Sequence, residues 1–224
     1  MPAQTIRIDF VSDVSCPWCA IGLAALEQAV QRLDGAVAVD LHFQPFELNP
    51  QMAAEGEDVA EHLAKKYGSS PAQMRQNQEG IRQRGAAVGF TFNFDQRSRI
   101  YNTFDAHRLL HWAGLEGRQS ELKHALLAAY FTDGEDVGSP AVLARVAGEV
   151  GLDAERARAI LAGDDYAEEV RAQERFYTER GIQSVPSIII DERRLIQGGQ
   201  PVEVFEQVLR RVAAEGKAEG QAEG

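Results

Sequence analysis

The chain has 224 residues, of which 44% are hydrophobic and 25% charged, and its formal net charge is −11. This length and composition are typical of one large globular domain, or of a domain that carries a substantial insertion. A negative surface repels phosphate groups, so nucleic acid and anionic membranes are poor partners. No stretch approaches the apolar length of a transmembrane helix, and the N-terminus lacks the features of a signal peptide, so we expect a cytoplasmic protein.

The N-terminal part alternates strand and helix patterns. Residues 5–13 alternate apolar and polar side chains, which predicts a strand. Residues 19–33 carry apolar side chains at helical spacing, and Asp34-Gly35 predicts the end of that helix. Residues 36–46 predict a second strand. A strand, a helix and a strand in this order predict a βαβ unit, whose two strands are parallel.

The middle of the chain, residues 51–162, predicts an inserted, all-helical subdomain. A short apolar run at 90–95 within it fits either a loop or a strand. Six segments show helical periodicity between Gly, Asp and Ser-Pro breaks: 58–68, 70–89, 103–114, 121–134, 139–151 and 153–163.

Strand patterns return towards the C-terminus. Residues 164–181 predict a helix, and two short apolar runs joined by a polar turn near Glu192 predict a hairpin. A last helix is expected with Pro201 at or near its first position. The charged, low-complexity residues 216–224 predict a disordered tail. The predicted order is therefore β-α-β, a helical insertion, and α-β-β-α.

Cys16 and Cys19 are the only cysteines in the chain, and they lie where the first helix is expected to begin. The unpaired N–H groups and partial positive charge of a helix N-terminus favour a thiolate, which is the form that attacks a disulfide. Cys19 lies on the same helix face three residues on, and can attack a mixed disulfide at Cys16. This spacing predicts a redox dithiol, whereas a structural pair or a zinc site, which usually needs four ligands, fits less well.

Three further features bear on the chemistry of the cysteines. Pro17 suits the first turn of a helix, where its missing N–H costs nothing. Trp18 is a large aromatic side chain that we expect to be exposed and to face the substrate. Val185-Pro186 precedes a run that is typical of a buried strand, and the trans isomer is the commoner one for such a bond.

Four segments together resemble the DsbA family of thioredoxin-fold proteins, and in particular its cytoplasmic FrnE-like branch: residues 9–19, 44–50, 102–113 and 184–190. The resemblance implies an α/β thioredoxin fold, with residues 1–50 and 163–215 forming the thioredoxin-like domain. It implies that Cys16 and Cys19 are the active dithiol, and that Val185-Pro186 is a cis-proline loop facing them. The Val185 backbone would then pair with an extended substrate segment. The resemblance also suggests that Asn102 and His107 line the cleft between the helical insertion and the core.

The implied activity is that of a protein disulfide oxidoreductase or isomerase. Cys16 would be the nucleophile and Cys19 the resolving thiol, acting on protein or peptide disulfides. No bound cofactor is needed, thioredoxin or glutathione would serve as reductant, and a homodimer is compatible with the sequence. Some FrnE relatives carry a second cysteine pair that this chain lacks.

Two alternatives stay open. One is a glutathione-dependent isomerase or transferase that acts on a small molecule, because hydroxychromene-carboxylate isomerases and kappa-class glutathione transferases resemble this architecture. Those proteins have serine where Cys16 stands. The other is a peptide-binding chaperone. Six aromatic residues could line a groove for unfolded peptide, although core packing is their more usual role: Phe43, Phe46, Phe90, Phe92, Phe94 and Trp112.

Other polar residues give weaker signals. His107 and His111 are four residues apart, but no third metal ligand is evident, so a helix face or a packing role is favoured over a metal site. Asp13 and Glu47 would change the thiol chemistry if they were buried nearby, but exposed salt-bridge partners are the more usual role of carboxylates.

Overall fold

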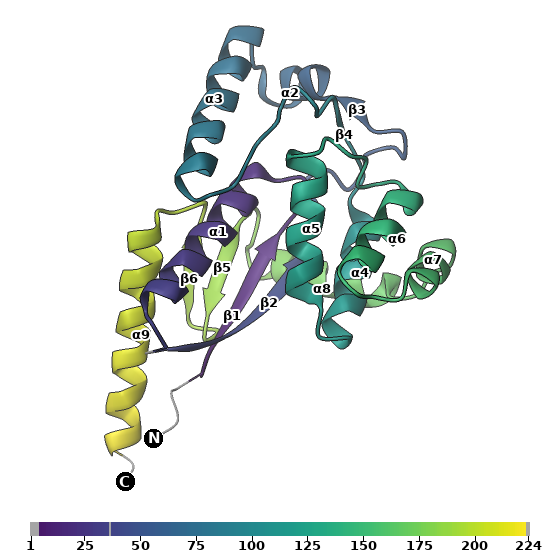
Figure 1. Ribbon diagram of the computed structural model, residues 1–224. Coiled ribbons are helices and arrows are strands. Elements are labelled where there is room, and N and C mark those ends of the chain that lie inside the picture. The colour runs from purple at the N-terminus through teal and green to yellow at the C-terminus, as the bar shows by residue number, and fades with distance from the viewer. Residues whose placement is uncertain (1–4, 36, 223–224) are drawn as a thin grey trace.

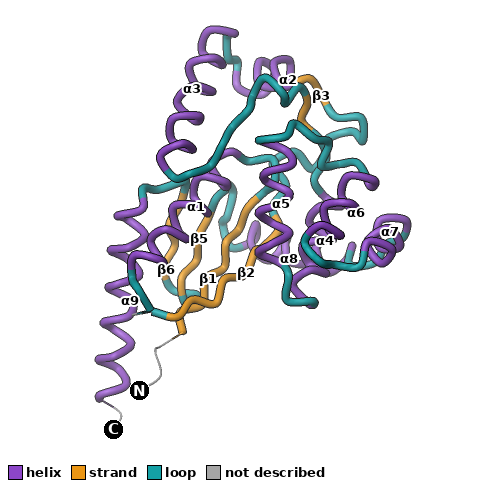
Figure 2. The backbone as a smooth tube through the Cα atoms, viewed as in Figure 1, coloured by secondary structure: helices purple, strands orange, loops and turns teal. Residues whose placement is uncertain are grey.

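The computed structural model describes residues 5–35 and 37–222, and its centre is a four-stranded mixed sheet (Figures 1 and 2). The strand order is β2-β1-β5-β6. β1 (Thr5–Ser12) is parallel to β2 (Ala38–Pro45) and antiparallel to β5 (Ser187–Ile190), and β5 is antiparallel to β6 (Arg194–Gln197). The parallel pair and the C-terminal hairpin that the sequence predicts are therefore confirmed.

Helices cover both faces of this sheet. α1 (Pro17–Arg32) and α9 (Val202–Ala222) pack against each other on one face. The alternating side chains of β1 explain this arrangement, because Phe10 and the isoleucines before it are buried in the main core on that face. On the other face Val11 packs with Tyr177 of α8 (Ala167–Glu179) in a smaller apolar cluster.

The insertion contains the six predicted helices, but it is not entirely helical. A two-stranded sheet pairs β3 (Glu57–Asp58) with β4 (Arg99–Ile100), and strands of two residues are too short to show an apolar alternation. The run at 90–95 is a loop. The helices are α2 (Val59–Tyr67), α3 (Pro71–Ala87), α4 (Phe104–Leu115), α5 (Gln119–Phe131), α6 (Pro140–Glu149) and α7 (Ala154–Ala162).

The last helix is longer than predicted. α9 continues through Ala222, so the expectation of disorder over 216–222 is wrong. Alanine, glutamate, lysine and glutamine fill most of this segment, and they are strong helix formers even where nothing apolar needs to be buried. Residues 223–224 of the predicted tail lie outside the described residues.

Two helices of the insertion lie against the β2 side of the sheet. α4 and α5 both contact β2. The Gln119 side chain closes the free edge of this strand, because its Oε1 accepts from the Phe43 N–H at 2.9 Å and its Nε2 donates to the Phe43 carbonyl at 3.0 Å. α3 lies over the start of α1 (Figure 1). In the described part of the chain, no helix combines the length and the apolar character that crossing a membrane requires.

Candidate functional site

The dithiol lies at the start of α1. Cys16 is the N-cap residue, Pro17 follows in the first turn, and the Cys19 N–H donates to the Cys16 carbonyl at 3.1 Å. Both cysteines are free thiols, with exposed fractions of 3% for Cys16 and 0% for Cys19. The structure therefore places both sulfurs at a helix N-terminus, as the sequence predicts, and leaves the second one wholly enclosed.

The Val185-Pro186 loop, which directly precedes β5, contacts Cys16. The peptide bond is cis, as the family resemblance implies and unlike most X-Pro bonds. The Cys16 Sγ donates a hydrogen bond to the Val185 carbonyl at 3.6 Å. Gly22 of α1 makes this approach feasible, because a Cβ at that position would lie 3.2 Å from Cγ of Pro186.

Trp18 borders an open groove beside the dithiol. Its side chain is 38% exposed, and the Arg84 guanidinium lies 5.5 Å from the ring centroid. Arg84 also donates to the Gly199 carbonyl at 2.7 Å, which joins α3 to the turn before α9. The groove has a volume of about 800 Å³, and its α3 side is lined mainly by hydrophilic residues such as Gln73 and Asn77.

Asp13 is a fully buried carboxylate three residues before Cys16. It accepts from the Ser15 N–H at 3.2 Å, from the Ser15 hydroxyl at 3.0 Å and from the Leu48 N–H at 2.7 Å. Burial alone would raise the pKa of Asp13, but His107 and the Leu48 and Ser15 amides outweigh it and hold that pKa below its usual value. The expectation that Asp13 is exposed is wrong, because its side chain is needed to bond the loop that carries the cysteines.

The structure brings His107, but not Asn102, against this carboxylate. His107 is buried, with Nε2 3.5 Å from Asp13 Oδ1 and 3.1 Å from the Phe46 carbonyl. Asn102 uses its amide within the insertion: it accepts from the Phe104 N–H at 2.9 Å and donates to the Met52 carbonyl at 3.2 Å.

The histidine pair on α4 is not part of a metal-binding cluster. The His111 ring lies against Tyr166, with centroids 5.3 Å apart. Over residues 5–35 and 37–222, no three or more His, Cys, Asp or Glu side chains are grouped so that they could hold a metal ion.

Glu47 is also buried, contrary to the expectation of an exposed carboxylate. It does form the salt bridge that was expected of it, with Arg171 of α8. Burial and the negative charge of Glu174 raise the pKa of Glu47, and Arg171 opposes both. The Arg171 guanidinium also lies 3.7 Å from the Phe104 ring centroid, so this cluster joins α8 to the insertion.

Lys123 of α5 is a residue that the sequence analysis missed. It is 1% exposed, and burial lowers its pKa, while the nearby Cys19, Asp13 and Cys16 oppose that change. Burial likewise raises the pKa of the Cys19 thiol well above its usual value; Cys16 raises it further, and Lys123 opposes the rise. One sequence signal could have identified Lys123, since it lies four residues before Leu127 on an otherwise apolar helix face.

Comparisons with known proteins agree with this geometry. The family model of the DSBA-like thioredoxin domain matches residues 7–210. A probable DsbA oxidoreductase from Streptomyces coelicolor, known from its crystal structure, is 36% identical with a TM-score of 0.86, covering 94% of this chain and 91% of that one. The uncharacterized protein YwbO of Bacillus subtilis (strain 168) is 28% identical over 207 residues, which are 92% of this chain and 96% of that protein.

A more distant structure shares the fold. The cytosolic disulfide reductase DsbM from Pseudomonas aeruginosa, solved with GSH, has a TM-score of 0.62 and 18% identity, covering 92% of this chain and 98% of that one. The fold, the dithiol at the start of α1 and the match over residues 7–210 lead to one conclusion: the chain belongs to the DSBA-like thioredoxin domain family.

Proposed function

We propose that this chain is a thiol-disulfide oxidoreductase of the FrnE-like branch, acting on protein or peptide disulfides in the cytoplasm. The observation that carries the proposal is the position of Cys16, which caps the N-terminus of α1 and contacts the carbonyl of the cis Val185-Pro186 loop. A helix N-terminus favours the attacking thiolate, and the backbone of Val185 beside it offers polar groups with which a substrate strand could pair.

The reaction follows from the order of the two sulfurs. The Cys16 thiolate attacks a substrate disulfide, and one substrate sulfur leaves as a thiolate. The Cys19 thiol then loses its proton and attacks Cys16 Sγ, which closes the Cys16–Cys19 disulfide and releases the second substrate thiol. Thioredoxin or glutathione would return the pair to the dithiol form, and an isomerase would instead return electrons to the same substrate.

A redox titration tests this proposal. The protein is equilibrated in glutathione buffers, and its free thiols are trapped and counted at each potential. A midpoint near about −270 mV would indicate a thioredoxin-like reductant, and one near about −180 to −120 mV an isomerase or oxidant. If Cys16 and Cys19 form no reversible disulfide at any potential, the oxidoreductase proposal is wrong.

A second candidate is a glutathione-linked activity on small molecules. The hydrophilic groove beside Trp18 favours it, because Arg84 and amide side chains suit a small hydrophilic peptide better than an unfolded apolar one. DsbM, which shares the fold, was solved with GSH. This candidate predicts that glutathione binds to a Cys16→Ser variant in calorimetry, whereas the dithiol proposal needs no such binding.

The chaperone alternative receives no such support. Phe43, Phe92, Phe94 and Trp112 are at most 7% exposed. The partly buried Phe46 and Phe90 pack against apolar clusters, so core packing accounts for all six rings.

A further inference from the structure

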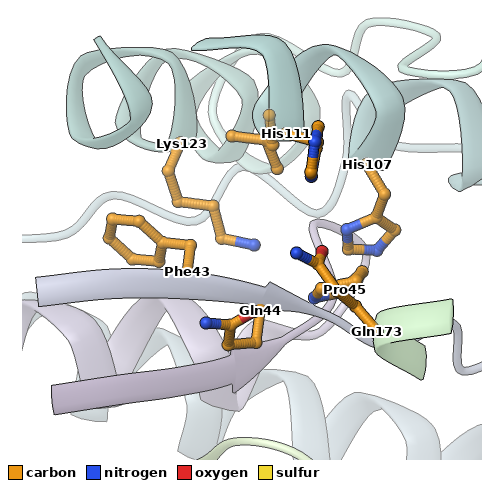
Figure 3. Close-up of a pocket in the computed structure, with 8 residues that line it drawn as sticks. Phe43, Gln44, Pro45, His107, His111, Lys123 and Gln173 are labelled. Carbon is orange, nitrogen blue, oxygen red and sulfur yellow. The ribbon is translucent and has the colours of Figure 1, made fainter. Parts of the chain in front are cut away.

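Lys123 carries a buried amine that has no hydrogen-bond partner among the described residues. Its side chain descends from α5 towards β2 with Nζ 5.9 Å from the Phe43 ring centroid (Figure 3). Burying an unpaired ammonium group is costly, and replacing it by an apolar side chain of similar volume is often neutral or stabilising. Packing alone therefore does not account for a lysine at this position.

The amine points into a small cavity of about 10 Å³, which is roughly the space of one water molecule. Polar groups from three elements line it beside Lys123: Gln44 of β2, His107 and His111 of α4, and Gln173 of α8. The cavity adjoins the Asp13 carboxylate through His107, whose Nε2 lies 3.5 Å from Asp13 Oδ1.

The charged and titratable groups around this amine belong to the dithiol region. Cys19, Asp13 and Cys16 each interact with it electrostatically, with Cys19 the strongest of the three. The two α4 histidines face the same cavity (Figure 3). Burial and Cys16 raise the pKa of the Cys19 thiol and Lys123 opposes that rise, so a positive charge at Nζ favours the Cys19 thiolate.

The resolving step needs that ionisation. When Cys19 attacks the mixed disulfide, its S–H bond breaks, a Cys19–Cys16 bond forms, and the bond from Cys16 to the substrate sulfur breaks. The substrate sulfur leaves with the electron pair of that bond and takes a proton from solvent. The proton of Cys19 must leave a site that water does not reach, and a buried thiol attacks only as its thiolate.

We propose that Lys123, supplied by the helical insertion, is a positioning residue for this step: the positive charge of its buried, unpartnered amine stabilises the thiolate that Cys19 leaves when its proton passes to solvent. The proposal rests on the dithiol function proposed above. It assigns the insertion a part in the chemistry in addition to covering the dithiol.

A two-phase thiol assay tests the proposal. The reduced protein reacts with 5,5′-dithiobis(2-nitrobenzoate): the first thionitrobenzoate released reports attack by Cys16, and the second reports attack by Cys19 on the mixed disulfide. A Cys19→Ser variant should release only the first thionitrobenzoate and therefore identifies the first phase. Lys123→Met keeps the length and volume of the side chain and removes the charge.

For Lys123→Met we expect the second phase to slow at least ten-fold at pH 7, and its pH profile to move up by about one unit, because a tenfold change in thiolate fraction is one pH unit. The first phase should change less than three-fold, and the melting temperature should not fall. Leu127→Met on the same helix is the control, because it changes core packing without charge and should alter neither phase.

The outcomes separate the two proposals. If the wild-type protein releases no second thionitrobenzoate, the dithiol function itself is wrong. If it does, and Lys123→Met keeps the wild-type rate and pH profile, the role of Lys123 is wrong. If the variant does not fold, the titration of Lys123 is followed by NMR in the wild-type protein, which has four lysines. Its midpoint should differ between the dithiol and disulfide forms, and equal midpoints would overturn the role.

Discussion

Replacing Asp13 with asparagine should destabilise the protein strongly, although the two side chains have nearly the same shape. The carboxylate uses both oxygens, with Oδ1 accepting from the Ser15 N–H and Oδ2 from the Ser15 hydroxyl and the Leu48 N–H. An asparagine amide offers only one acceptor oxygen. Whichever way it is turned, its NH₂ group faces a backbone N–H, of Ser15 or of Leu48, and that donor loses its partner.

The size of the effect follows from these bonds. A buried donor left without an acceptor costs about 1–3 kcal/mol, and a remaining bond that loses its charged acceptor weakens by about 1 kcal/mol. We therefore expect Asp13→Asn to lower the free energy of unfolding by about 2–4 kcal/mol at pH 7. The ionised Asp13 stabilises the fold above the pKa it has in the unfolded chain, because its pKa in the folded state is lower. This contribution is lost as the pH falls below about 4, so the difference between the proteins should shrink there.

Urea denaturation of both proteins, with the cysteines kept reduced and followed by circular dichroism, measures this difference, and an unchanged slope shows that the transitions are comparable. The matched control is Asp40→Asn, because Asp40 is a half-exposed carboxylate bonded to the exposed His42, and its loss should cost less than about 1 kcal/mol. If Asp13→Asn costs no more than Asp40→Asn, our account of the buried carboxylate is refuted.

Three further outcomes are expected. Arg108 donates to the carbonyls of Ile160 in α7 and of Gly163 and Asp165 between α7 and α8. Arg108→Lys should therefore cost about 3 kcal/mol in the same urea assay, whereas Arg118→Lys, at an exposed position, should leave the midpoint unchanged. Gln119→Leu should cost about 1–2 kcal/mol, because two backbone groups on the edge of β2 lose their bonds; a melting temperature equal to that of the wild type would contradict this. Trp18 is far more exposed than Trp112, so Trp18→Phe should remove most of the acrylamide-quenchable fluorescence, and quenching that persists would mean that Trp112 is accessible.

The strands and helices could be predicted from the sequence because their apolar periodicities are regular. Ile188 and its neighbours form a buried run, and the six helical segments of the insertion are bounded by clear breaks. The short pairing of Glu57 with Ile100 could not be predicted, because two residues carry no pattern. Nor could the end of α9, where helix propensity competes with a composition that is typical of disorder.

In the candidate site, too, some residues could be predicted from the sequence and others could not. Cys16 and Cys19 are marked by their spacing and by the helix start, and Val185 could be placed beside them only through the family resemblance, since 169 positions separate it from Cys16. Asp13 and Lys123 carry charges, and a charged side chain in a sequence normally indicates the surface. Their burial depends on how α4 and α5 pack against β2, which local patterns do not encode.

The pairing of β1 with β5 has a consequence for the order of folding. Ile8 lies opposite Ile190 and Phe10 opposite Ile188, so the middle of the sheet joins segments from opposite ends of the chain. The helices of the insertion are synthesised between them and can fold from local contacts. At ordinary translation rates their synthesis takes on the order of 10 s, during which the inner edge of β1 has no partner strand. The nascent chain therefore carries the segment with Cys16 and Cys19 beside an open sheet edge until the last strands emerge from the ribosome.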